Sequence, residues 1–249
     1  MSINQIIKEK CENSLLFFTR YIFKENTGNK FEAAKFHETL ANTLQKVNEG
    51  KIKRLIINVP PRYGKTEIAV KMFIAWSLAK RPESKFIHLS YSDSLALDNS
   101  SMTKEYINSD AFQRIWGLTL KKDSQSQKKW YTKEGGGVYA TASGGAITGF
   151  GAGTGGAIII DDPLKPDDAL SDVRRSFINN RYNTTIRSRV NDRSVPIIVI
   201  MQRLHEDDLS GYLIGGGSGE DWHHLKLPAL DDNNNPLWPE KHSFDELEA

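Results

Sequence analysis

The stretch LIINVPPRYGKTE, from Leu55 to Glu67, contains the strongest local signal in this sequence. It begins with an apolar run typical of a buried strand, and Gly64, Lys65 and Thr66 stand directly before a segment with helical periodicity. Backbone N–H groups at such a helix N-terminus face an anion, Lys65 can reach the β- and γ-phosphates of a nucleotide, and the Thr66 hydroxyl can ligate magnesium. We therefore interpret this stretch as a strand followed by a phosphate-binding loop.

The loop departs from the usual phosphate-loop pattern at its first position. That pattern has glycine five residues before the second glycine, where this chain has Val59, followed by Pro60 and Pro61. A GKT tripeptide also fits a helix N-terminus with a solvated lysine. The strand before the tripeptide and the helix after it favour phosphate binding.

Four apolar runs predict the strands of a parallel sheet. They are rich in β-branched residues and lack two-residue alternation, which is typical of strands covered on both faces. The four runs are Leu55–Val59, Phe86–Tyr91, Ala157–Ile160 and Val195–Met201.

Two helices are predicted between these strands. Apolar residues on nearly every face of residues 65–80 indicate a buried crossover helix that ends before Pro82. A second helix is predicted from three- and four-residue spacing, broken at Asn191 and Asp192; its apolar residues are Leu170, Val173, Phe177, Ile178, Tyr182, Ile186 and Val190. Alternating strands and helices predict an α/β fold with a doubly wound, mostly parallel sheet, whose catalytic edge lies at the carboxyl ends of the strands.

A phosphate loop needs a carboxylate at the end of a neighbouring strand, and GGAIIIDDP supplies two. Asp161 follows four apolar residues in the pattern of a Walker B strand and would hold magnesium through water. Asp162 would lie beside the γ-phosphate and orient the attacking water. The alternative for Asp162 is that, with Pro163, it opens a turn and caps the next helix.

A third segment, IIVIMQRLHEDDLSGYL, places Gln202 and Arg203 at the end of another buried strand. Such a strand end can sense the γ-phosphate. His205, Asp207 and Asp208 lack the spacing of a metal-binding HExxH helix, and acids in the first turn of a helix favour its dipole. We interpret these acids as capping residues.

Composition describes an ordinary globular chain. Of 249 residues, 39% are hydrophobic and 26% charged, which argues against disorder, and the apolar runs are too short to span a bilayer. The N-terminus lacks the pattern of a secretory signal, and Cys11 stands alone, so a cytoplasmic location is expected. The net charge is only +2, so any contact with nucleic acid depends on local patches.

The chain is predicted to contain one main domain and the start of a smaller one. Residues 1–50 appear helical in pattern and aromatic, and are expected to pack on the sheet. We predict an ATPase-type domain over residues 1–210 and the start of a lid or linker subdomain over residues 211–249, because composition changes at GGGSG.

The variant loop PPRYGKTE, the strand IIIDDP and the segment MQRLHEDDLSGYL together resemble the large terminase subunit of tailed bacteriophages. The similarity runs from about Phe31 through Leu213. It implies a RecA-like P-loop NTPase fold of the ASCE type that hydrolyses ATP with magnesium. It further implies a homo-oligomeric ring at the procapsid, translocation of double-stranded DNA, a portal protein and a small terminase subunit as partners, and the host cytoplasm as location.

By position, the resemblance assigns roles to residues of three motifs. Lys65 and Thr66 match the phosphate-loop pair, Asp161 the Walker B acid, and Gln202 with Arg203 part of the coupling motif. Arg62 matches an arginine that some terminases direct at the γ-phosphate, although a solvated loop arginine is an equal alternative. The expected nucleotide-binding residues are Pro61, Arg62, Tyr63, Gly64, Lys65, Thr66 and Glu67, together with Phe36 and His37 near the adenine.

Two departures from the family pattern affect the catalytic assignment. Relatives often have glutamate after the Walker B aspartate, where this chain has the shorter Asp162. Relatives also often carry an arginine in the glycine-rich stretch, where this chain has Phe150. An arginine given to a neighbouring subunit would then come from Arg187, Arg189 or Arg193, unless these form a solvated helix face.

Two other segments have a purely structural interpretation beside the functional one. Phe36 and His37 could be a core ring and a surface histidine. The segment KKDSQSQKKW, residues 121–130, could contact DNA phosphates through four lysines and an aromatic residue, or it could be a solvated loop.

A DNA-packaging motor ATPase is the hypothesis that these observations favour. A terminase nuclease domain does not fit in this chain, so cleavage is not expected. The alternatives are a helicase-like remodelling ATPase, disfavoured because such motors usually carry a second RecA-like domain, and a non-hydrolysing scaffold that binds portal or small terminase.

Overall fold

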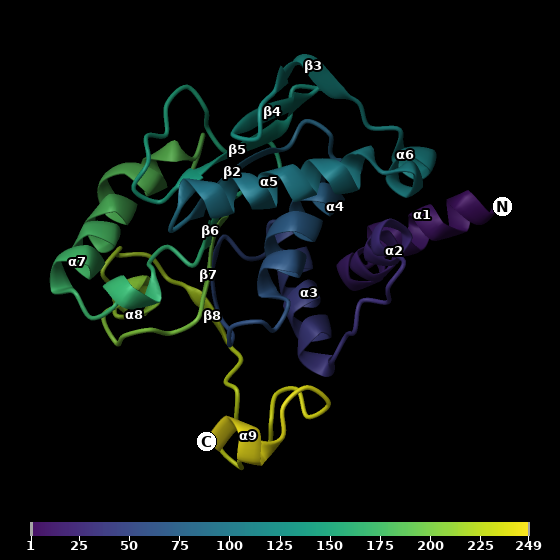
Figure 1. Ribbon diagram of the computed structural model, residues 1–249. Coiled ribbons are helices and arrows are strands. Elements are labelled where there is room, and N and C mark those ends of the chain that lie inside the picture. Colours follow the sequence, from purple (N-terminus) through teal and green to yellow (C-terminus); the bar gives the residue numbers. More distant parts are fainter. Residues whose placement is uncertain (1, 249) are drawn as a thin grey trace.

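The predicted strands lie in one eight-stranded sheet in the computed structural model, which describes residues 2–248 except the side chains of residues 124 and 125. The strand order is β3-β4-β5-β2-β6-β7-β1-β8 (Figure 1). All neighbours from β5 to β8 pair in parallel, and β4 pairs antiparallel with both β3 and β5. The strands are β1 (Arg54–Asn58), β2 (Lys85–Ser90), β3 (Leu120–Gln125), β4 (Lys129–Thr132), β5 (Gly137–Ala142), β6 (Ile158–Asp161), β7 (Ile197–Met201) and β8 (His223–Lys226).

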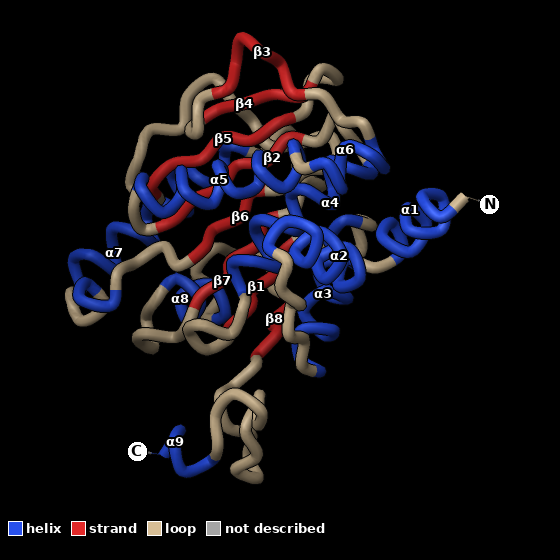
Figure 2. Tube along the Cα trace, turned by 45° about the vertical axis from the view of Figure 1, so that its right-hand side comes forward, coloured by secondary structure: helices blue, strands red, loops and turns tan. Residues whose placement is uncertain are grey.

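Helices cover both faces of this sheet, so the doubly wound α/β class is confirmed (Figure 2). One face packs against α1 (Ile3–Asn13), α2 (Leu15–Thr27), α3 (Lys35–Asn48), α4 (Phe73–Lys80), α5 (Asp93–Asn108) and α6 (Asp110–Trp116). The other face packs against α7 (Asp172–Arg181) and α8 (Leu209–Ile214). A last short helix, α9 (Phe244–Glu248), follows β8.

The crossover helix predicted over residues 65–80 is present, with a π-helical part, Glu67–Met72, leading into α4. The helix predicted after β6 is α7, continued by a π-helical turn, Tyr182–Ile186, and a 3₁₀ turn, Arg187–Arg189. Only the second half of its predicted apolar stripe is buried. Tyr182 and Ile186 are in the core, whereas Leu170 and Val173 are 84% and 78% exposed.

The predicted domain boundary at residue 210 is displaced. Helix α8 begins at Leu209 and crosses it, and β8 pairs in parallel with β1 as part of the main sheet. Departure from the sheet therefore begins after Lys226, and a lid or linker beyond that residue stays a prediction. Among residues 2–248, no helix is long and apolar enough to cross a membrane.

Candidate functional site

The predicted phosphate loop turns at the carboxyl end of β1 through two left-handed residues. Arg62 has φ 63° and Gly64 has φ 72°. Pro61 and Arg62 are exposed at the turn, whereas Val59, in place of the expected glycine, is 2% exposed. Left-handed backbone is open to glycine but strained for arginine, so this loop is held by its surroundings.

Two polar pairs join the loop to the end of β6. The Lys65 ammonium lies 2.5 Å from Asp162 Oδ2, and the Thr66 hydroxyl donates to Asp161 Oδ2 at 2.8 Å. Strand β7 lies between β1 and β6, so the three segments predicted from sequence meet at one edge of the sheet. This edge is formed by the carboxyl ends of parallel strands, where α/β proteins bind ligands.

Asp161 has an oxygen available for a cation. The residue is 1% exposed, and its Oδ1 has no hydrogen-bond partner among the described residues. Burial raises the pKa of this carboxyl, the nearby charge of Asp162 adds to the effect, and Lys65 and Thr66 oppose it. Carboxylate and hydroxyl oxygens suit Mg²⁺, so Asp161 and Thr66 fit a magnesium ion.

Asp162 stands on a strained turn that directs its carboxylate along the strand ends. Its φ is 43°, its N–H donates to the Ile200 carbonyl at 2.9 Å, and its Oδ1 accepts from the Gln202 N–H at 3.3 Å. The residue therefore connects the loop lysine to the end of β7. It does not cap α7, whose N-cap is Ser171.

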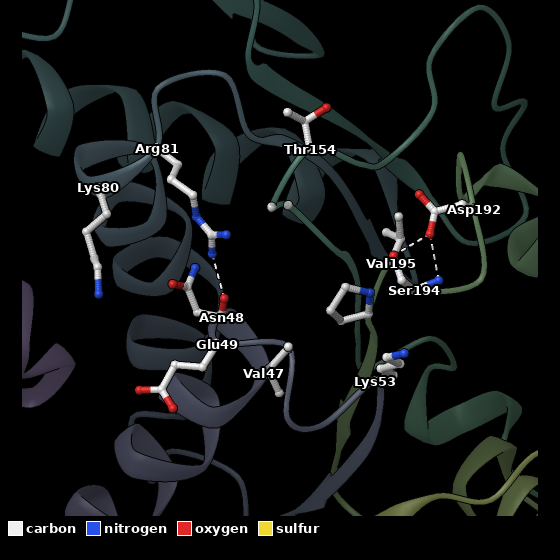
Figure 3. Close-up of a pocket in the computed structure, with 14 residues that line it drawn as sticks. Val47, Asn48, Glu49, Lys53, Lys80, Arg81, Thr154, Asp192, Ser194 and Val195 are labelled. Carbon is white, nitrogen blue, oxygen red and sulfur yellow. Dashed lines mark hydrogen bonds between the residues drawn. The ribbon is translucent and has the colours of Figure 1, made fainter.

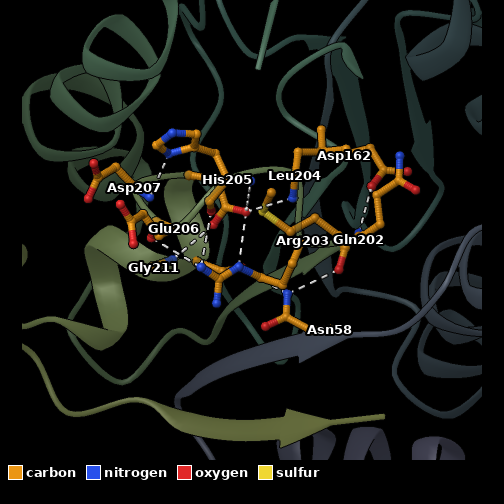
Figure 4. Close-up of polar contacts among 12 residues, drawn as sticks. Asn58, Asp162, Gln202, Arg203, Leu204, His205, Glu206, Asp207 and Gly211 are labelled. Atoms are coloured by element: carbon orange, nitrogen blue, oxygen red, sulfur yellow. Dashed lines mark hydrogen bonds and ion pairs between the residues drawn. The ribbon is translucent and has the colours of Figure 1, made fainter. Parts of the chain in front are cut away.

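Gln202 and Arg203, the predicted phosphate sensors, point in different directions (Figure 4). Gln202 lies beside Asp162, whereas the Arg203 guanidinium donates to Asp208 Oδ2 at 3.0 Å and to the Glu206 carbonyl at 3.1 Å. Asp208 also accepts the Gly211 N–H at 2.9 Å as N-cap of α8. The capping interpretation is confirmed for Asp208, and Arg203 is bound within the loop rather than directed at the phosphate position.

His37 forms a hydrogen bond to the backbone of the predicted phosphate loop and lies in the core, away from any adenine site. Its Nδ1 accepts the Ala34 N–H at 2.9 Å, so Nε2 carries the proton and donates to the Tyr63 carbonyl at 3.1 Å. Burial lowers the pKa of His37 to about 4. His37 and Phe36 are 0% and 4% exposed, so neither side chain is open to an adenine in this conformation, and the alternative of a surface histidine is wrong as well.

The same loop is covered by residues far along the chain. Trp238 packs within 5.9 Å of the Tyr63 ring and 4.9 Å of the His37 ring, measured between centroids. The Lys241 ammonium lies over Tyr63 and Trp238 and donates to the Arg62 carbonyl. The Tyr63 ring is thereby 2% exposed, so its predicted part in nucleotide binding is limited to its backbone.

Glu67 does not face the phosphate position. Its carboxylate accepts the Tyr106 hydroxyl at 2.6 Å and pairs with the Lys71 ammonium at 2.9 Å. The predicted nucleotide contact is therefore wrong for this side chain, which instead ties the first turn of the helix to α5.

The candidate trans arginines lie at the opposite edge of the sheet. Arg187 and Arg193 line a cavity together with Lys53, which precedes β1, and Arg54, its first residue. The Arg189 carbonyl accepts the Ala152 N–H in the segment before β6. They cannot reach the phosphate loop of their own chain, and their role toward a neighbour stays a prediction. A second cavity, of about 650 Å³, lies at this same edge beside Arg81 and Thr154 (Figure 3).

Sequence reasoning missed two parts of the site. Ser90 and Ser143, at the ends of β2 and β5, carry buried hydroxyls without a hydrogen-bond partner among the described residues, and β2 is the neighbour of the strand that carries Asp161. No motif marks them. Trp238 and Lys241 were missed because they lie more than 170 residues from the loop they cover, and no periodicity connects them to it.

The sheet order and the flanking helices are consistent with the P-loop NTPase fold. Comparison with protein-family models and with curated proteins found no match. Among solved structures, the chain is similar to the HK97 bacteriophage large terminase, with a TM-score of 0.61 and 14% sequence identity over 89% of this chain. The chain spans 44% of that protein's length. This likeness shows a shared fold.

Proposed function

We propose that this chain is the ATP-hydrolysing motor of a terminase large subunit that packages DNA. The observation that carries the proposal is the meeting of Lys65 with Asp162 and of Thr66 with Asp161 at the end of β6. The similarity to the HK97 terminase supports the packaging role. The substrate is ATP, and the ion is Mg²⁺.

In this proposal, residues of the chain divide the work of phosphoryl transfer. Thr66 and Asp161 would hold Mg²⁺, which supplies positive charge to the phosphate oxygens. Lys65 binds the β- and γ-phosphates, and Arg62, exposed at the turn, is placed to add charge at the γ-phosphate. Asp162 orients the attacking water and accepts its proton.

The Lys65–Asp162 pair makes catalysis depend on nucleotide. Without ATP the ammonium neutralises the carboxylate that would act on water, with only 8% and 22% of the two side chains exposed. Phosphate oxygens compete for the same ammonium, so binding of ATP releases Asp162. The hydrogen bond from the Gln202 N–H to Asp162 then couples the position of this carboxylate to the end of β7.

The proposal extends to partners and location. Double-stranded DNA, a portal protein and a small terminase subunit would be its partners, in a homo-oligomeric ring on the procapsid within the host cytoplasm. A neighbour in the ring could receive Arg187, Arg189 or Arg193, since these residues lie at the edge opposite their own phosphate loop.

Steady-state hydrolysis of ATP with magnesium, at low and high protein concentration, tests the proposal. We expect Lys65→Ala and Asp162→Asn each to lower kcat by about 10²-fold or more, with Lys24→Ala, an exposed lysine of α2, as the matched control. Retained activity in Asp162→Asn would assign the base elsewhere. ATP binding without hydrolysis at any concentration, with and without duplex DNA, would favour the scaffold and contradict the proposal.

A further inference from the structure

The hairpin of β3 and β4 concentrates positive charge. Residues 120–132 contain four lysines and one aspartate, a net charge of three positive units in a chain whose total is +2. Lys121, Lys122 and Lys128 are exposed, and none of the four lysines forms an ion pair with a described residue. Backbone and side-chain hydrogen bonds lower the pKa of the Asp93 carboxyl, and nearby Lys128 adds to the effect, so part of the Lys128 charge is balanced. The segment, for which a DNA contact and a solvated loop were both considered, is therefore a β-hairpin with a net cationic surface.

Three of these lysines are positioned over two tyrosine rings. Lys121 and Lys129 lie 5.9 and 5.4 Å from the Tyr131 centroid, and Lys128 lies 5.8 Å from that of Tyr139. Contact with the ring faces limits the freedom of each ammonium group while leaving it hydrated. These three lysines, which we call the lysine face, are thus positioned by the rings of Tyr131 and Tyr139 on two paired strands.

The β3–β4 hairpin is anchored to helix α5. Trp130, the aromatic residue of the predicted DNA contact, is fully buried and donates to Ser100 on α5 at 2.9 Å. At the tip, the Ser126 hydroxyl accepts the Lys129 N–H at 2.9 Å. Trp130 consequently ties the hairpin to α5, which also contacts β2 and β5.

Protection of a sheet edge does not account for the lysine face. Edge strands often carry lysines that prevent pairing with other chains, and this reason covers Lys121 on β3. Lys129 belongs to β4, which is paired on both sides, and Lys128 precedes it at the tip. Because β4 runs antiparallel to β5, the tip lies at the edge of the sheet that also carries Asp161.

We propose that the lysine face binds the phosphate backbone of double-stranded DNA without reading base sequence. This inference rests on the proposed function for the identity of the polyanion. Three ammonium groups held over two rings can pair with phosphate oxygens, and such contacts carry no base sequence. The Tyr139 hydroxyl already donates to the Ala146 carbonyl at 2.9 Å. The contact joins DNA to the same sheet edge that binds nucleotide.

Binding of a labelled mixed-sequence duplex to the full chain, without nucleotide, measures this contact across about 50 to 200 mM salt. Replacing Lys121, Lys128 and Lys129 by glutamine should lower the slope of log affinity against log salt by about 2 to 3, since each phosphate contact contributes about 0.9. At 0.1 M salt the corresponding loss of affinity is on the order of 100-fold. Lys128→Gln alone should lower the slope by about 0.9.

A charge-matched control is Lys24→Gln, Lys30→Gln and Lys46→Gln, three exposed lysines of the N-terminal helices and their linker. It should keep the wild-type slope. Wild-type binding by the lysine-face variant, an equal loss in the control, or no duplex binding by the unmodified chain would each overturn the inference. Because the assay uses no nucleotide, its result is independent of whether the chain hydrolyses ATP.

Discussion

Acidification should weaken the fold through His37, because burial disfavours the charged form of its ring. The neutral ring accepts the Ala34 N–H and donates to the Tyr63 carbonyl. A proton on Nδ1 would place a donor against the Ala34 donor and a charge in a buried site. The folded state therefore binds this proton less tightly than the unfolded chain, as the lowered pKa of about 4 records.

The stability that neutral His37 provides is complete above its unfolded pKa of 6.5 and declines as the pH falls toward 4. At pH 5 the loss is about 2 kcal/mol relative to pH 7. Lys241, which faces the ring, acts in the same direction on the pKa. Because Tyr63 is part of the predicted phosphate loop, loosening of the His37 contact should also weaken the proposed nucleotide binding.

Urea unfolding of the wild type and of His37→Gln, between about pH 7 and pH 5, isolates this contribution. The variant should be less stable at pH 7, and its deficit should shrink by about 2 kcal/mol at pH 5 because glutamine does not titrate. His88, also buried with a pKa lowered to about 4 by burial, is present in both proteins and cancels. His223→Gln, on the exposed side of β8, controls for loss of a histidine. A deficit that stays constant with pH would refute the reasoning.

Three further substitutions have defined outcomes. Gly64→Ala should lower stability by about 1 to 2 kcal/mol and weaken nucleotide binding, because φ is 72° and the new Cβ would lie 3.1 Å from His37 Nε2; thermal unfolding and nucleotide titration measure both. Arg62→Gly should raise stability by about 0.5 to 1 kcal/mol by relieving its left-handed backbone, yet lower kcat if the side chain stabilises the γ-phosphate; equal kcat would assign it to the loop alone. Asp208→Ala should cost about 1 to 3 kcal/mol in urea unfolding, since it removes a buried acceptor that serves several part-buried donors, and a loss below 0.5 kcal/mol would contradict its capping role.

The parts of the fold that the sequence predicted are those encoded by contiguous residues. Each of the four predicted strands is a short, largely buried run without two-residue alternation, and each is present within about one to two residues of its expected bounds. Lys65 and Thr66 follow β1 after a short loop, and Asp161 and Asp162 stand at the end of β6, so their meeting was expected from the parallel arrangement of these strands.

Strand β5 was not predicted because it begins within a glycine-rich segment. It begins in GGGVYATA, which suggests a loop, yet Gly136 and Gly137 are needed where the chain passes closely between neighbours. A Cβ on Gly136 would lie 2.1 Å from the Pro82 carbonyl oxygen, and one on Gly137 2.1 Å from that of Trp130. Glycine here permits close backbone approach within a sheet, which only the neighbouring segments reveal.

Periodicity overestimated the burial of α7 for a related reason. Leu170, Val173 and Phe177 have the same spacing as the buried Tyr182 and Ile186, but the sheet extends only under the second half of the helix. Spacing shows that residues share a face of a helix. It does not show whether another element lies opposite that face.

The valine in place of the first loop glycine is explained by contacts that sequence could not show. Val59 stays in the core, and the turn occurs three to five residues later, at Arg62 and Gly64. The left-handed arginine is unfavourable by itself, but His37 bonds the next carbonyl and Lys241 bonds that of Arg62. The loop is thus shaped by one segment before β1 and another after β8, so its conformation is coupled to both. A loop whose shape depends on outside contacts can respond when those contacts change, which a loop curved by its own glycines would do less readily.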